Sequence, residues 1–127
     1  MKYLLDTHTL IWFFNGDLEL SENARQIILD TNNQKYASIV SVWELSIKVS
    51  LNKLKFDGKA KGFLDLIYKN GFKLLNINQN YIFKLEQLEN FHKDPFDRIL
   101  IATAISENMK LITRDENIHL YPIEYVW

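Results

Sequence analysis

Four carboxylate side chains lie at positions from which they could act together. Asp6, Glu44 and Asp115 each come shortly after an apolar run of strand length, and Asp97 opens the helix that leads into the last of these runs. In a parallel sheet the carboxyl ends of the strands share one edge, and the connecting helices run antiparallel to the strands. Connectivity alone therefore predicts that all four acids lie at one edge of a sheet, where open α/β folds form their sites.

Such a cluster favours a particular chemistry. Carboxylates packed together are unstable unless protons or cations neutralise them. Oxygen ligands in a chain with no cysteine and no paired histidines suit a hard divalent cation, Mg²⁺ or Mn²⁺. These ions hold a phosphoryl group and lower the pKa of a bound water. The acids therefore favour metal-dependent hydrolysis of a phosphodiester.

Each acid also has a purely structural interpretation. Glu44 lies three residues after Ser41, which is the spacing of a capping box. Asp6 is placed to cap the following helix, Asp97 to complement a helix dipole, and Asp115 to form a turn. Taken singly, these roles are at least as common as a catalytic one. Four independent caps, however, have no reason to share one edge of a sheet.

Four further residues are candidates for supporting roles. Thr7 and Thr113 could position water or phosphate beside a metal ion, or could satisfy local backbone groups. Arg98 could reach a phosphate or pair with a neighbouring acid. Asp94 lies one turn before Asp97 and precedes a proline, which pushes its backbone out of the helical region. We therefore expect Asp94 to cap the helix and Asp97 to be the metal ligand.

The stretch from Asp94 to Asp115 must position two of the acids. Asp94 is a suitable N-cap, and Pro95 suits the first helical position. The apolar residues that follow cover most of the helix circumference, which predicts burial on more than one side. Asn108 offers a left-handed stop, and Leu111–Thr113 is a short apolar strand.

Strands and helices alternate along the rest of the chain. The expected strands are 3–5, 36–40, 73–77, 111–113 and the tail 123–127. The expected helices are 9–15, 21–31, 41–51, 63–68, 79–88 and the helix that follows Asp94, with a loop over 51–61. This alternation predicts a single α/β domain over residues 1–127, with a central, mostly parallel sheet of about five strands.

Composition limits the classes of function. The chain has 127 residues, a net charge of −1 and no cysteine, which argues against a disulfide framework or a strongly basic nucleic-acid surface. No apolar run reaches membrane-spanning length and no signal-peptide pattern is present, so we expect a cytoplasmic protein. The lysines between Lys48 and Lys61 could form a phosphate-binding strip, although a solvated face is the commoner outcome.

Four segments together resemble the PIN-domain family, specifically the VapC-type toxins of bacterial toxin–antitoxin pairs. They are LLDTHTLIW, SVWELSIKVSLNKL, DPFDRILIATA and LITRD, and they occur in the family's order over nearly the whole chain. The resemblance implies a three-layer α/β/α sandwich and places the four metal-site acids at Asp6, Glu44, Asp97 and Asp115. It also matches Thr113 to the family's Ser/Thr two residues before the last acid.

The resemblance implies further properties. The family cleaves RNA with Mg²⁺ or Mn²⁺, and its toxins are usually dimeric and blocked by a cognate antitoxin. Trp12, Phe13, Trp43 and the stretch 51–56 are candidates for protein contacts, although core burial is the commoner fate of aromatic residues. RNA, an antitoxin and a second copy of the chain are therefore the expected partners.

Two alternatives belong to other classes. A phosphatase of the haloacid-dehalogenase type is suggested by Asp6 after a strand with Thr9 near it. That family has a second Asp two residues after its nucleophile, where this chain has His8. A non-catalytic binding module with a PIN-like fold is the second alternative, and the presence of all four acids argues against it.

Overall fold

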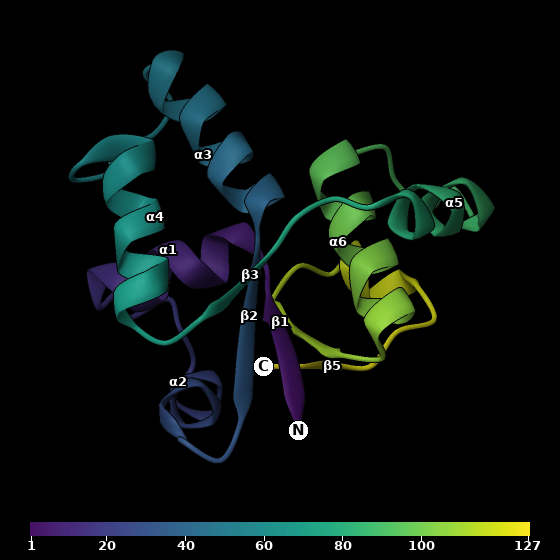
Figure 1. The fold of residues 1–127 in the computed structure, drawn as a ribbon, viewed down its shortest axis with the longest axis horizontal. Helices are drawn as coiled ribbons and strands as arrows, with labels where there is room; N and C mark the ends of the chain where they lie inside the picture. Colours follow the sequence, from purple (N-terminus) through teal and green to yellow (C-terminus); the bar gives the residue numbers. More distant parts are fainter.

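Five parallel strands form the centre of the molecule, as seen in the computed structural model, which describes residues 1–127 (Figure 1). They are β1 (Lys2–Leu5), β2 (Gln34–Ser38), β3 (Lys73–Leu75), β4 (Lys110–Ile112) and β5 (Tyr125–Val126). Their order in the sheet is β3-β2-β1-β4-β5, and every neighbouring pair is parallel. The predicted parallel sheet of about five strands is therefore confirmed.

Six helices cover the two faces of this sheet. They are α1 (Thr7–Asn15), α2 (Glu22–Leu29), α3 (Ile39–Ser50), α4 (Lys59–Lys69), α5 (Gln79–Gln87) and α6 (Pro95–Glu107), with a short 3₁₀ turn η1 (Ile118–Leu120). In Figure 1, α1, α2 and α4 lie on one side of the strands, and α5 and α6 lie on the other. The arrangement is the predicted three-layer α/β/α sandwich.

The core is divided into two parts by the sheet. Side chains alternate across a strand, so Tyr3 and Leu5 enter one part and Leu4 enters the other. The first part is completed by fully buried residues of α1, α2 and α4, among them Leu10, Ile28 and Phe63. The second is built largely from α6 and is completed by residues such as Leu100, Leu111 and Ile118. The central strand β1 thus supplies side chains to both halves.

Helix α6 forms as its sequence predicts. The Asp94 carboxylate accepts hydrogen bonds from the backbone N–H groups of the first turn, and Pro95 occupies the first helical position. Every residue from Arg98 to Ala104 is buried, which confirms burial on more than one side. The helix ends at Asn108, whose backbone is left-handed with φ of 55°.

The boundary between β2 and α3 differs from the prediction. The strand ends at Ser38, whose hydroxyl oxygen accepts from the Val40 N–H at 3.1 Å and caps the helix. Ser41 lies inside α3, so the predicted capping box with Glu44 is wrong, and Glu44 falls in the second helical turn. Ile39 and Val40 are β-branched and therefore resemble a strand, but their position in a packed helix overrides that local preference.

Smaller differences concern other element ends. The predicted loop over 51–61 is too long, because α4 begins at Lys59, directly after Gly58. Gly58 has φ of +78°, and a Cβ atom there would lie 2.9 Å from the Gly62 Cα, so the turn into α4 requires glycine. Helix α1 begins at Thr7, two residues earlier than expected. None of the helices has both the length and the apolar character needed to span a membrane.

Candidate metal centre

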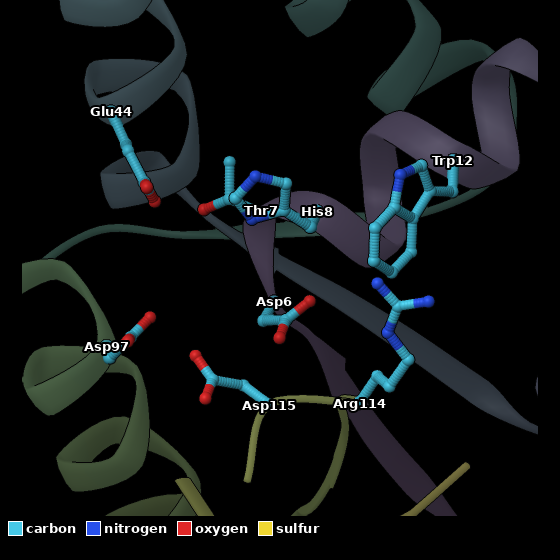
Figure 2. Close-up of a pocket in the computed structure, with 8 residues that line it drawn as sticks. All are labelled: Asp6, Thr7, His8, Trp12, Glu44, Asp97, Arg114 and Asp115. Atoms are coloured by element: carbon cyan, nitrogen blue, oxygen red, sulfur yellow. The ribbon is translucent and has the colours of Figure 1, made fainter. Parts of the chain in front are cut away.

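A cavity of about 260 Å³ opens at the edge of the sheet where the strands end (Figure 2). It brings together all four acids that the sequence assigns to this edge. They arrive from separate elements: one directly after β1, one on α3, one on α6 and one shortly after β4. The residues lining the cavity are Asp6, Thr7, His8, Trp12, Glu44, Asp97, Arg114 and Asp115.

Asp6 lies at the centre of this group and also caps α1. Its Oδ1 accepts hydrogen bonds from the Thr9 N–H at 2.9 Å and from the Thr9 hydroxyl at 2.6 Å. Burial raises the pKa of Asp6, and hydrogen bonds from Thr113 and Thr9 oppose that rise. The predicted capping role of Asp6 is therefore present, and it uses only one of the two carboxylate oxygens.

Asp97 projects from the first turn of α6 toward the other acids (Figure 2). Its Oδ2 lies 3.1 Å from His92 Nε2. The pKa of Asp97 is raised to about 8, first by burial and then, in decreasing order, by the negative charges of Asp94, Asp115, Asp6 and Glu44. The structure thus concentrates more negative charge at this point than its own groups neutralise.

Glu44 and Asp115 complete the acidic set. Glu44 is buried, and its Oε2 forms an ion pair with Lys48 Nζ at 2.8 Å, one turn further along α3. Asp115 lies in the turn after β4, where its Oδ1 accepts from the Asn117 N–H at 2.9 Å. Its own N–H donates to the Thr113 hydroxyl at 3.1 Å. The predicted turn at Asp115 is therefore present, and the side chain lines the cavity.

The four supporting candidates divide into two groups. Thr7 lines the cavity and donates to the Ser41 hydroxyl at 2.9 Å, and Thr113 is buried beside Asp6. Asp94 lies outside the cavity lining, where its Oδ1 accepts from two backbone N–H groups of α6. Arg98 also lies outside the lining.

The expectation for Arg98 needs correction. Its side chain is buried, and it donates to the hydroxyl of Tyr121 and to backbone carbonyl oxygens, including that of Glu89 at 2.8 Å. It forms no ion pair with an acid. The physical reason is that backbone carbonyl groups of the chain after α5 point toward α6. They accept the hydrogen bonds that the guanidinium donates, so its N–H groups are not available to a phosphate.

Sequence reasoning missed two residues beside the acids. Arg114 lines the cavity and forms an ion pair with Glu19. Its Cζ atom lies 4.5 Å from the centre of the Trp12 ring. Its position directly before Asp115 in the sequence was the available signal. His92 has no such signal, because it reaches Asp97 only through the fold of the loop before α6.

The residues of this cavity fit a hard divalent cation by donor type and by charge. All four acids offer oxygen atoms, and the raised pKa of Asp97 reports a charge density that a cation would relieve. No three His, Asp or Glu side chains lie close enough in the structure to hold a metal ion together. Two of the acids instead contact protein groups, Glu44 with Lys48 and Asp97 with His92.

Comparison with solved structures shows the same fold in several proteins. VapBC2 from Rickettsia felis, solved with a DNA fragment from its promoter, has a TM-score of 0.75 at 20% identity, covering 100% of this chain and 99% of that one. A toxin–antitoxin complex from Klebsiella pneumoniae has a TM-score of 0.67 at 23% identity, covering 98% and 96%. VapBC-1 from nontypeable Haemophilus influenzae has a TM-score of 0.67 at 20% identity, covering 99% and 97%. At these identities the similarity concerns the fold.

Sequence comparison gives the family. No curated protein sequence matches the chain. The model of the PIN domain, however, matches residues 3–123, which is nearly the whole length and includes all four acids of the cavity. The chain belongs to the PIN domain family.

Proposed function

We propose that this chain is a metal-dependent ribonuclease that acts in the cytoplasm as the toxin of a toxin–antitoxin pair. The observation that carries the proposal is the meeting of four carboxylates, from four separate elements, in one cavity at the carboxyl edge of a parallel sheet. Membership of the PIN family agrees with this reading and argues against the phosphatase alternative, as does His8 in place of a second Asp.

The four acids Asp6, Glu44, Asp97 and Asp115 would hold Mg²⁺ or Mn²⁺. A bound ion of this kind supplies Lewis acidity for hydrolysis of a phosphodiester. The side chains prepare the site in two ways. Thr9 and Thr113 hydrogen-bond to Asp6, and the turn after β4 holds Asp115 through the Asn117 N–H. The fold thus brings the four acids to one cavity, and their side chains would move closer together around a bound cation.

A cationic side chain would help the metal ion to hold RNA, because half of the residues that line the cavity are acids that repel phosphate. Arg114 is the one lysine or arginine that lines the cavity, and in Figure 2 it lies with Trp12 on the opposite side from Glu44 and Asp97. We propose that Arg114 exchanges its ion pair with Glu19 for a phosphate next to the cleaved bond. The exposed guanidinium makes this exchange accessible.

The partners follow from the same proposal. The structures that share this fold include toxin–antitoxin complexes, which supports an antitoxin as a partner of this chain. The chain also exposes large apolar side chains on α3 and just after it, where Trp43 is 55% exposed and Leu51 is 57% exposed. Surfaces of this kind are typical of protein contacts. We propose that these side chains contact the antitoxin or a second copy of the chain. Sedimentation of the purified chain would test for the homodimer.

The test is cleavage of RNA by the purified chain, freed of any antitoxin. We expect cleavage with Mg²⁺ or Mn²⁺, none in EDTA, and none in the variant Asp6→Asn. Asn caps a helix about as well as Asp, so this variant should fold. The matched control is Asp65→Asn, which removes one charge from an exposed position on α4 and should cleave as the wild type does.

Three outcomes would contradict the proposal. Cleavage that persists in EDTA, after contaminating nuclease is excluded, would remove the metal mechanism. A loss of thermal stability in metal-free Asp6→Asn would assign Asp6 a structural role, because removal of a charge from a crowded acidic site should leave stability unchanged or higher. A folded protein that binds RNA but never cleaves it would favour the non-catalytic module.

A further inference from the structure

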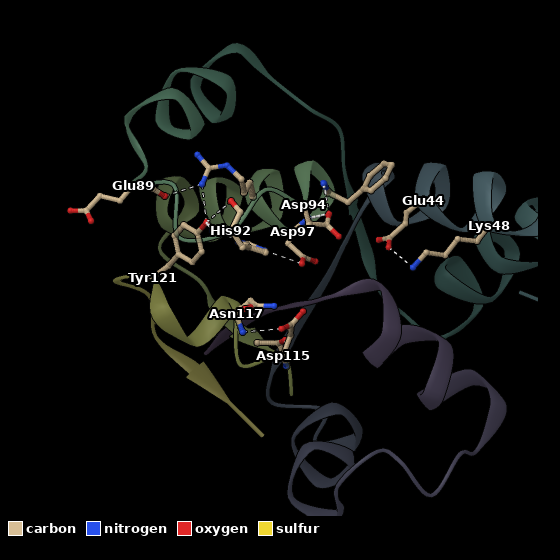
Figure 3. A network of polar contacts seen from close by, with 12 residues as sticks. Glu44, Lys48, Glu89, His92, Asp94, Asp97, Asp115, Asn117 and Tyr121 are labelled. Carbon is tan, nitrogen blue, oxygen red and sulfur yellow. Dashed lines mark hydrogen bonds and ion pairs between the residues drawn. The ribbon is translucent and has the colours of Figure 1, made fainter. Parts of the chain in front are cut away.

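The contact between His92 and Asp97 lies just outside the cavity, in a largely buried place. His92 belongs to the loop between α5 and α6, and its Nε2 lies 3.1 Å from Asp97 Oδ2 (Figure 3). The two side chains are only 12% and 16% exposed. No protein group donates to the other oxygen, Oδ1, and Asp97 lines the cavity. The protein therefore holds Oδ2 of Asp97, whereas Oδ1 is free to bind a group in the cavity.

The imidazole of His92 is in turn held by Tyr121. Its Nδ1 lies 2.8 Å from the Tyr121 hydroxyl (Figure 3). The same hydroxyl lies 2.8 Å from Arg98 Nη1. A guanidinium can only donate, so Tyr121 accepts from Arg98. The His92 backbone N–H also reaches this oxygen, at 3.3 Å. These two donors occupy both lone pairs of the phenol oxygen.

The Tyr121 hydroxyl has one hydrogen of its own to donate and two acceptors of His92 within reach. With its lone pairs occupied, the Tyr121 hydroxyl must donate its own hydrogen. Its nearest acceptor is Nδ1 of His92 at 2.8 Å, whereas the His92 carbonyl lies at 3.5 Å. Nδ1 is then an acceptor, so the ring hydrogen sits on Nε2 and is donated to Asp97. Donation runs from Arg98 through Tyr121 and His92 to Asp97.

Arg98, the first donor in this chain of hydrogen bonds, is held by several further contacts. Arg98 is buried, and it also donates to the carbonyl oxygens of Leu85 and Leu88 at 3.4 Å each, and of Glu89 at 2.8 Å. Tyr121 is buried as well. The orientation of the His92 ring is therefore determined by Tyr121, which Arg98 of α6 holds in turn.

We propose that His92 is a positioning residue for Asp97. Its Nε2–H holds Oδ2 so that Oδ1 is directed into the cavity, while Tyr121 and Arg98 fix the imidazole tautomer that makes this donation possible. The inference rests on the proposed function, in which Asp97 is a ligand of the divalent cation. Partners of this kind orient ligands, and their removal typically lowers metal affinity or activity by about 10- to 100-fold.

The experiment compares three variants with the wild type. His92→Ala removes the donor, His92→Gln places an amide N–H at a similar reach, and Tyr121→Phe removes only the hydroxyl that fixes the tautomer. The control is Tyr81→Phe, which removes a partly buried hydroxyl group. This hydroxyl donates a hydrogen bond to Glu107 at 2.8 Å, near the other end of α6. Binding of Mn²⁺ alone is measured by calorimetry, and RNA cleavage is separated into kcat and KM.

We expect His92→Ala to weaken Mn²⁺ binding and kcat by about 10- to 100-fold with little change in KM for RNA. His92→Gln should restore most of the loss, and Tyr81→Phe should behave as the wild type. Nitrogen NMR of labelled histidine should show hydrogen on Nε2 of His92 in the wild type and a mixture of tautomers in Tyr121→Phe. A merely structural contact would not produce the rescue or the tautomer change.

Two results would overturn the inference that His92 positions Asp97. If His92→Ala keeps full Mn²⁺ affinity and kcat but melts at a lower temperature, the contact only closes the loop onto α6, and the inference is overturned. A wild-type ring with its hydrogen on Nδ1 would overturn it as well. Failure of the proposed function has a different signature, because Asp6→Asn and Asp97→Asn would then leave Mn²⁺ binding and cleavage unchanged.

Discussion

Burial and the neighbouring acids of the cavity together raise the pKa of Asp97. Its pKa is raised from 3.8 to about 8, so over that interval the folded chain retains a proton that the unfolded chain has lost. The free energy of unfolding must therefore fall as pH rises through the interval. Asp6 acts in the same direction, because burial also raises its pKa.

Asp97→Asn should remove much of this dependence. In EDTA, urea unfolding of the wild type should give a free energy that declines between about pH 4 and 8, and the decline should be shallower in the variant. The variant should then be more stable than the wild type near pH 8, because its amide carries no charge. The control is Asp65→Asn, whose curve should parallel that of the wild type. Parallel curves for Asp97→Asn would show that this carboxylate ionises freely in the folded state.

At the scale of the element, α6 separates two neighbouring acids by role. Asp94 Oδ1 accepts from the N–H groups of Phe96 and Asp97, at 2.9 and 3.1 Å, so it is engaged by the helix end. Asp97, three residues later, faces the cavity. The same helical turn thus supplies both a cap and a candidate ligand.

Substitutions at Asp94 should reveal this division. Asp94→Ala should lower the free energy of unfolding by roughly 0.5–2 kcal/mol, whereas Asp94→Asn should be nearly neutral because Asn caps about as well. Cleavage should fall only modestly in both, and Asp97→Asn should lose most of it. Thermal melts and cleavage rates on the three variants decide the matter. If Asp94→Asn abolishes cleavage as fully as Asp97→Asn, Asp94 belongs to the site.

At the scale of the whole molecule, net charge would limit how the proposed RNA substrate is held. The net charge is −1, so no overall positive field attracts a polyanion, and few cationic contacts are available near the acids. Binding should therefore depend only weakly on salt. For single strands, the slope of log affinity against log salt is about −0.7 for each phosphate neutralised.

Arg114→Gln should reduce this slope by about 0.7, since it removes one phosphate contact. The measurement uses RNA binding to a chain that also carries Asp6→Asn, so that no cleavage occurs during the titration. Lys69→Gln, an exposed residue at the end of α4 outside the cavity lining, is the matched control and should leave the slope unchanged. A slope unaffected by Arg114→Gln would exclude this residue from RNA binding.

Several features of this protein are determined by the sequence alone, because their causes are local. Alternating apolar runs and helical segments predict the parallel sheet. Asp94, Pro95 and Asn108 predict both ends of α6, since caps depend on residues within a turn of each other. Parallel topology then carries Asp6 and Asp115 to one edge without any knowledge of side-chain contacts.

Other features are decided only by tertiary structure, because they depend on contacts between distant segments. Ile39 and Val40 read locally as a strand, and packing made them the first turn of α3. Arg98 faces carbonyl groups of the chain after α5, so it is withdrawn from any phosphate. His92 reaches Asp97 only because Tyr121, 29 residues away, holds its ring. Such orientations arise from burial and hydrogen-bond satisfaction among segments that share no local pattern.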